Sequence, residues 1–146
     1  MKIIVLIPVY NDWKSVFRLL DEINNLSIEN EFQLSVLIIN DASNFDRQEI
    51  EKSFKNINTI KILNMEKNIG HTRCIATGLK YIFEKDQFDY VIPMDGDGED
   101  RPQEIKDFLE KIKVYNEKTI VGERVKRSES MTFKICYQLH KIITFI

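Results

Sequence analysis

Two aspartates, Asp95 and Asp97, follow an apolar segment in the stretch YVIPMDGDGEDRP, residues 90–102. At the end of a strand, side chains two residues apart can point the same way. Gly96 and Gly98 let the backbone turn tightly beside a ligand. A divalent cation such as Mg²⁺ or Mn²⁺ prefers one or two carboxylates, with water and phosphate oxygens completing its shell. The pattern therefore suits a metal bound to a diphosphate.

Two other interpretations apply to the same residues. An isolated D-x-D is often a solvated acidic turn, and acidic residues such as Glu99 and Asp100 are expected ahead of a helix because of its dipole. A phosphatase that forms an aspartyl-phosphate also uses D-x-D, but after its first strand. Here the motif follows the fourth apolar segment, which argues against the phosphatase.

The elements that must position these carboxylates alternate between strand and helix patterns. Helices are predicted after Asn11-Asp12, along a face with Ile75, Leu79, Ile82 and Phe83, and from Pro102 onward. Segments apolar on both faces predict buried strands at residues 3–9, 34–39, 60–63, 90–94 and 119–122. This order predicts an α/β fold, a mostly parallel sheet with helices on both faces. Ligands bind such sheets beyond the carboxyl ends of the strands, where the polar residues of this chain gather.

Composition limits the class of protein. The chain has 146 residues, enough for one domain, and its net charge of -2 gives no footprint for nucleic acid. Residues 111–146 carry a net +5 and residues 1–110 a net -7, so the basic end either meets an anionic partner or is a solvated face. Cys74 and Cys136 form no disulfide or metal pattern. No apolar run is long enough to span a bilayer, and we expect a cytoplasmic protein.

The last segment differs from the rest. Between residues 131 and 146 most positions are apolar, while Lys134, Gln138 and Lys141 fall on one side of a helix. Such a helix could pack on the domain, form a homodimer, or make peripheral membrane contact at the cytoplasmic face. We therefore divide the chain into an α/β domain, residues 1–127, and an amphipathic C-terminal helix, residues 128–146.

Five segments together resemble the motifs of the family-2 glycosyltransferases, which have a Rossmann-like nucleotide-binding GT-A fold. They are IPVYND (7–12), INDASN (39–44), NIGHTRCIATGL (68–79), MDGDGEDRPQEI (94–105) and VGERVKR (121–127). The fourth is similar to the form typical of the branch that glycosylates dolichyl or other polyprenyl phosphates. The resemblance covers nearly the whole chain and implies an inverting transferase with a nucleotide-sugar donor and a Mg²⁺ or Mn²⁺ cofactor.

The resemblance also implies roles for single residues. Those that would bind the nucleotide, its base, ribose or diphosphate are Pro8, Tyr10, Asp12, Asp41, Gly70, Arg73 and Asp95. The residues that would take part in catalysis are Asp95, Asp97 and Arg124, with Asp97 holding the metal. Arg124 and Arg127 would meet phosphate on the donor or the acceptor.

The acceptor decides whether a protein base is required. A hydroxyl acceptor needs a base, whereas a phosphate monoester, with a second pKa of about 6, is already a nucleophilic anion at neutral pH. No convincing base follows Asp97 in the sequence, which favours a polyprenyl phosphate. The alternatives are a soluble or cell-surface glycan as acceptor, or an inactive or truncated nucleotide-binding module that needs a partner.

Overall fold

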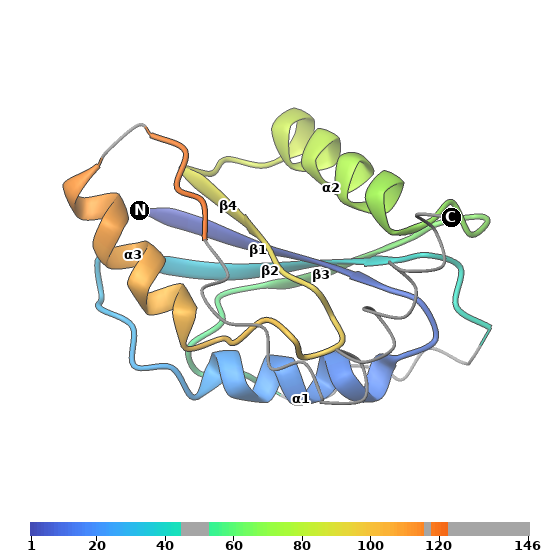
Figure 1. Ribbon diagram of the computed structural model, residues 1–146, viewed down its shortest axis with the longest axis horizontal. Helices are drawn as coiled ribbons and strands as arrows, with labels where there is room; N and C mark the ends of the chain where they lie inside the picture. Colours follow the sequence, from blue (N-terminus) through green and yellow to red (C-terminus); the bar gives the residue numbers. More distant parts are fainter. Residues whose placement is uncertain (45–52, 116–117, 123–146) are drawn as a thin grey trace, which may run out of the picture.

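The computed structural model describes residues 1–44, 53–115 and 118–122, which form a parallel sheet packed between helices (Figure 1). The strands are β1 (Lys2–Val9), β2 (Gln33–Asn40), β3 (Ile60–Asn64) and β4 (Tyr90–Pro93). The helices are α1 (Trp13–Asn24), α2 (His71–Lys85) and α3 (Glu104–Val114). The strand order is β3-β2-β1-β4, and every pairing is parallel. The α/β prediction, a parallel sheet with helices on both faces, is confirmed.

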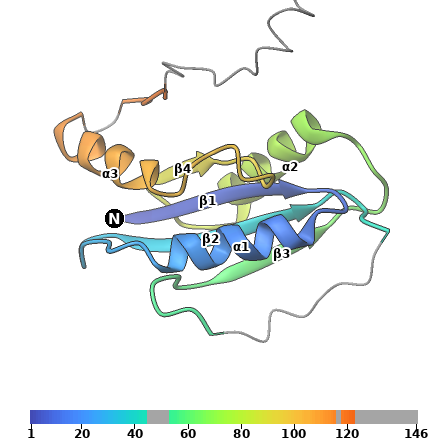
Figure 2. The ribbon, with the colours of Figure 1, turned by 60° about the horizontal axis from the view of Figure 1, so that its bottom comes forward.

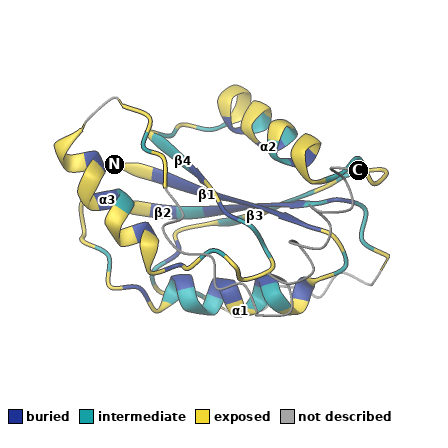
Figure 3. Cartoon of the chain, in the orientation of Figure 1, coloured by how far each residue is buried: buried dark blue, intermediate teal, exposed yellow. Residues whose placement is uncertain are grey.

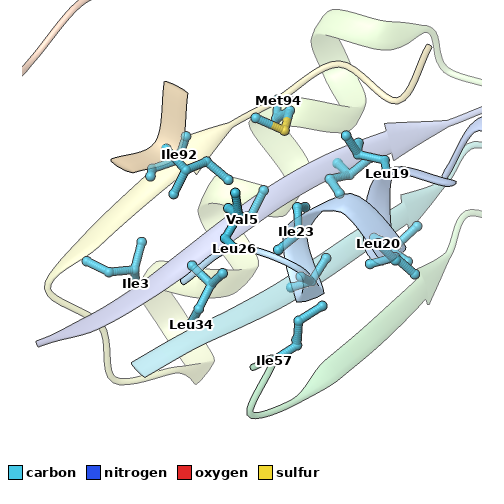
Figure 4. Packing of buried hydrophobic residues seen from close by; sticks show 14 of the residues in the cluster. Ile3, Val5, Leu19, Leu20, Ile23, Leu26, Leu34, Ile57, Ile92 and Met94 are labelled. Atoms are coloured by element: carbon cyan, nitrogen blue, oxygen red, sulfur yellow. The ribbon is translucent and has the colours of Figure 1, made fainter. Parts of the chain in front are cut away.

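The central strand β1 supplies both layers of the core because successive side chains point to opposite faces of a sheet. Ile3, Val5 and Ile7 belong to the cluster beneath α1 and α3, whereas Ile4 and Leu6 belong to the cluster beneath α2. Figures 1 and 2 show α2 on one face and α1 with α3 on the other. In Figure 4 the first cluster brings side chains of β1, β2, β4 and α1 into contact. The strands carry apolar side chains on both faces because helices cover both faces of the sheet.

Helix α2 packs on the sheet through a face that matches only part of the one that its apolar residues predicted. Its buried residues are Cys74, Gly78 and Ile82. Leu79 is 40% exposed and Phe83 is 80% exposed, and Figure 3 shows exposed residues along the outer side of the helix. A Cβ added at Gly78 would lie 2.4 Å from Leu6 Cδ1. Of the four predicted residues, Ile82 is buried and Ile75 packs against the core, whereas the prediction was wrong for Leu79 and Phe83. The small residue at position 78 lets the helix approach the sheet closely, and this decides which side is buried.

Two other element predictions are corrected. Pro102 does not begin the third helix: bonds from Glu104 N to Arg101 O (2.9 Å) and from Ile105 N to Pro102 O (3.0 Å) form a tighter turn before α3 starts. Residues 119–122 form no strand, although Ile120 packs against the core. The predicted helix at 128–146 lies outside the described residues. In the part of the chain that the structure describes, no helix has the length and apolarity to cross a membrane.

The strand register brings three loops to one edge of the sheet. Val9 pairs with Asn40, and the N–H of Asp41 donates to Val9 O at 2.8 Å. On the other side of β1, the N–H of Met94 donates to Leu6 O at 3.0 Å. Because the strands are parallel, the loops after β1, β2 and β4 all leave the sheet at its carboxyl edge, where the sequence placed the site.

Candidate functional site

A small open pocket lies at this edge, between the end of β1, the turn after β4 and the first residue of α2. Its volume is about 180 Å³. It is lined by Pro8, Val9, Tyr10, Asp12, His71, Asp95, Gly96 and Asp97. The structure therefore brings together five of the predicted site residues, which come from two segments more than eighty positions apart in the sequence: Pro8, Tyr10, Asp12, Asp95 and Asp97.

The two aspartates are held by a turn that hydrogen-bonds to itself. The N–H of Asp95 donates to Asp100 Oδ2 at 2.9 Å, and the N–H of Glu99 donates to Asp97 Oδ1 at 2.9 Å. Gly96 packs directly on β1, since a Cβ there would lie 2.9 Å from the backbone oxygen of Pro8. Only glycine fits at position 96, between Asp95 and Asp97, because a side chain there would collide with β1.

The charges of this turn are crowded. Partial burial raises the pKa of Asp95; the nearby His71 works against that shift, while Asp100, Asp97 and Glu99 add to it. Carboxylates that repel one another are stabilised by a cation between them. Among the described residues, no group of three or more His, Cys, Asp or Glu side chains could hold a metal ion. The pair Asp95 and Asp97 still fits Mg²⁺ or Mn²⁺, because such ions are often bound by one or two carboxylates plus substrate phosphates.

His71 is the ionisable residue of the pocket that the sequence analysis missed. It is the first residue of α2, and its Nε2 lies 3.3 Å from Asp95 Oδ1. Both side chains are about half exposed. One feature of the sequence could have indicated His71 as a site residue: it is titratable and directly follows Gly70, in a motif already assigned to nucleotide binding. Nothing in the sequence indicated that it would face Asp95.

Asp41 fastens the loop that leads into α2. Its side chain is 4% exposed, and its Oδ1 and Oδ2 accept the N–H groups of Ile69 (2.7 Å) and Gly70 (2.9 Å). Gly70 is the N-cap of α2 and has φ 87. This positive φ is a backbone conformation that favours glycine. Asp41 does not line the pocket. Its contact with the nucleotide base stays a prediction, while its hold on the Gly70 loop is a feature of the fold.

The loops after β1 and β2 are joined by reciprocal hydrogen bonds. The N–H of Asn11 donates to Ser43 Oγ at 2.9 Å, and the N–H of Asn44 donates to Asn11 Oδ1 at 2.7 Å. Asn11 (φ 59) and Ala42 (φ 56) have positive φ values, which are unfavourable for residues with a side chain. Asn adopts this conformation more readily than Ala does, so backbone strain is expected at Ala42, directly after Asp41.

Replacing Ala42 with Gly is expected to raise the free energy of unfolding by about 0.5–1 kcal/mol, because Gly adopts φ 56 without the clash of a Cβ. The hydrogen bond from the N–H of residue 42 to Asn40 O would remain. Chemical denaturation of the two proteins measures the difference. As a control, Ala76→Gly on the exposed side of α2 should lower the same quantity by about 0.5–1 kcal/mol. A loss of stability in Ala42→Gly would show that the strain is not real.

Cys74 lies next to this network and is fully buried. Burial, and then the neighbouring Asp41 carboxylate, raises the pKa of its thiol to about 12. At pH 8 only about one Cys74 in 10,000 should be a thiolate, the form that reacts. In a Cys136→Ser variant, iodoacetamide should therefore leave Cys74 unmodified in the native protein and label it in urea, as followed by mass spectrometry. Equal labelling in both states would contradict this environment.

The remaining predicted site residues are less well placed. Arg73 lies exposed in the first turn of α2 and does not line the pocket. Arg124 and Arg127 lie outside the described residues, so their contact with phosphate stays a prediction. The structure thus brings together Pro8, Tyr10, Asp12, Asp95 and Asp97 at one pocket, while the nucleotide, metal and acceptor roles of the predicted site residues stay predictions.

Comparisons with known proteins give a matching family and a matching fold. The family model described as "Glycosyl transferase family 2" matches residues 4–142. The chain is 27% identical over 124 residues to Uncharacterized protein MJ0544 of Methanocaldococcus jannaschii. The crystal structure of S. aureus TarS 1-349 superposes with a TM-score of 0.64 at 23% identity. The same protein in complex with UDP-GlcNAc gives a TM-score of 0.63 at 24% identity.

These alignments cover most of this chain but only part of the other proteins. The match to MJ0544 covers 83% of this chain and 51% of that protein. The match to TarS 1-349 covers 88% of this chain and 39% of that one. The chain thus spans about half the length of the curated relative, and the solved structures show the likeness of the fold alone.

Proposed function

The chain belongs to glycosyl transferase family 2, and from this premise we propose that it transfers a hexose from a UDP- or GDP-linked sugar, with inversion at the anomeric carbon. The observation that carries the proposal is the pocket in which the Asp95–Asp97 turn meets the end of β1. In a donor of this kind a base, a ribose, a diphosphate and the sugar are linked in that order. The pocket offers an aromatic ring at Tyr10 and two carboxylates at Asp95 and Asp97.

Asp97 would hold the divalent metal, with Asp95 beside it. Asp97 is exposed, so a cation can reach its carboxylate while the diphosphate and water complete the shell. The metal, when bound, would supply neutralisation of the charge that develops on the leaving diphosphate. Burial is the main cause of the raised pKa of Asp95, and the nearby carboxylates add to it; a bound cation would offset the repulsion among these carboxylates.

Tyr10 and Asp12 would contact the nucleoside. Tyr10 is 49% exposed beside buried Pro8 and Val9, so a large face of its ring is open for stacking against a base. Asp12 also caps α1, accepting the N–H of Ser15 at 3.2 Å. The pocket volume of about 180 Å³ is below the roughly 300–1,000 Å³ of ordinary ligand sites. The described residues would therefore enclose only part of the donor.

The acceptor that we propose is a polyprenyl phosphate. One of its phosphate oxygens would form a bond to the anomeric carbon as the bond from that carbon to the diphosphate oxygen breaks, and the nucleoside diphosphate leaves with the electron pair. Because the phosphate is already ionised at neutral pH, no protein base has to take a proton. Arg124 and Arg127 would meet this phosphate, and the segment 128–146 would lie against the membrane or a second copy.

A thermal-shift panel tests the donor side. UDP and GDP, each with and without Mn²⁺, should raise the melting temperature more when the metal is present; TarS, which shares the fold, is described in complex with UDP and with UDP-GlcNAc. Release of UDP or GDP from their sugar derivatives would then be measured with polyprenyl phosphate and with free sugars. Turnover only with the lipid phosphate supports the proposed acceptor, and turnover with sugars favours a glycan. Metal-dependent binding without turnover would identify a nucleotide-binding module that needs a partner, and no binding of either nucleotide would refute the proposal.

A further inference from the structure

The contact between His71 and Asp95 joins two parts of the site that come from different strands. His71 begins α2, after the loop that follows β3, and Asp95 follows β4. Nε2 of His71 lies 3.3 Å from Oδ1 of Asp95, and both residues line the pocket. In the described part of the chain this is the contact that Asp95 makes with a basic side chain, and it is an ion pair when His71 is protonated.

The other charged groups around Asp95 cannot orient its carboxylate. Asp97, Glu99 and Asp100 are all anionic and repel it. Asp100 accepts the backbone N–H of Asp95 and therefore holds the main chain rather than the side chain. An aspartate side chain on the surface of a turn samples several rotamers unless a partner holds it. The imidazole is the attractive partner that this geometry provides.

The position of His71 is itself fixed by the loop that precedes it, which is bound to the end of β2. Asp41, at the end of β2, accepts the N–H groups of the two residues that precede His71. The backbone of α2 therefore starts at a defined place, and its first side chain reaches across to the turn after β4. A continuous set of contacts runs from Asp41 through the Gly70 loop and His71 to Asp95.

We propose that His71 is a positioning residue of the nucleotide-sugar site, which orients the Asp95 carboxylate toward the donor diphosphate. This inference rests on the proposed function, since it takes the ligand at the Asp95–Asp97 turn to be a nucleoside diphosphate. His71 acts through Asp95, so its effect on binding should vanish when Asp95 can no longer respond. It should also be reproduced by a side chain that places an N–H donor where Nε2 now lies.

The test is a double-mutant cycle measured by calorimetry with UDP and GDP in the presence of Mn²⁺. His71→Ala should weaken binding of the preferred nucleotide by about three- to tenfold, the range expected for one lost polar contact. His71→Gln, whose amide can reach the position of Nε2, should restore most of the affinity, whereas the shorter His71→Asn should not. In an Asp95→Asn background, His71→Ala should change the affinity less than twofold, because positions that act through one another are not additive.

Two controls separate binding from folding. Thr72→Ala, at the next exposed position of α2, should leave the affinity unchanged, and melting curves should show that all variants are folded. Unchanged affinity in His71→Ala, or full additivity with Asp95→Asn, would overturn the inference while leaving the proposed function intact. If the wild-type protein binds neither nucleotide, the proposed function fails and the role of His71 fails with it.

Discussion

Asp97→Asn is expected to weaken Mn²⁺-dependent binding of UDP or GDP by about 100-fold or more while leaving the fold intact. A neutral amide oxygen binds a divalent cation more weakly than a charged carboxylate does, and loss of a first ligand should exceed the 10- to 100-fold cost of losing an outer partner. The side chain is exposed and packs in no core cluster. Its Oδ1 accepts the N–H of Glu99, and the amide oxygen of Asn can accept the same bond. Calorimetric titration with and without Mn²⁺ measures the effect.

The control for this prediction is Asp107→Asn, the same chemical change at an exposed position in the first turn of α3. It should leave nucleotide binding unchanged. Without metal, wild type and Asp97→Asn should bind nucleotide with similarly weak affinity, because the substitution removes only the part of the binding free energy that the cation supplies. Undiminished Mn²⁺-dependent binding in Asp97→Asn would remove the metal role of this residue.

Gly78→Val should lower the free energy of unfolding by about 3 kcal/mol, because added carbons at this position have no free space. A Cβ would lie 2.4 Å from Leu6 Cδ1 and 3.1 Å from Ile39 Cγ1. Both side chains are fully buried, so they cannot move aside without disturbing the sheet. Helix α2 would have to shift outward, carrying His71 away from the pocket. Urea denaturation followed by circular dichroism measures the loss.

The matched variant is Ala76→Val, which puts the same β-branched residue on the exposed side of the same helix. It should cost only about 0.5 kcal/mol, the difference in helix propensity. The contrast between the two variants isolates the close approach of α2 to β1 and β2. Similar losses in both would mean that the helix does not lie as close to the sheet as the structure shows.

Much of the fold could be predicted from the sequence because burial leaves a local pattern. Residues 3–9, and all of residues 34–39 except Ser35, are apolar, which requires cover on both faces, and they became the two central strands. Polar motifs begin where those runs stop. Parallel strands carry such ends to one edge, so the sequence predicted that Tyr10 and Asp95 lie at the same edge of the sheet. The strand order that makes β1 and β4 neighbours came from the structure.

The tertiary structure alone decided which faces and which side chains meet. Periodicity in α2 favoured a buried face with Ile75, Leu79, Ile82 and Phe83. The close approach at Gly78 instead buries Cys74, Gly78 and Ile82 and leaves Leu79 and Phe83 exposed. In the same way His71 was only one polar residue in a motif until the start of α2 came to lie beside the turn after β4. A sequence states which residues gain from burial or from charge. How close two elements can approach depends on both surfaces at once, and that is a property of the folded chain.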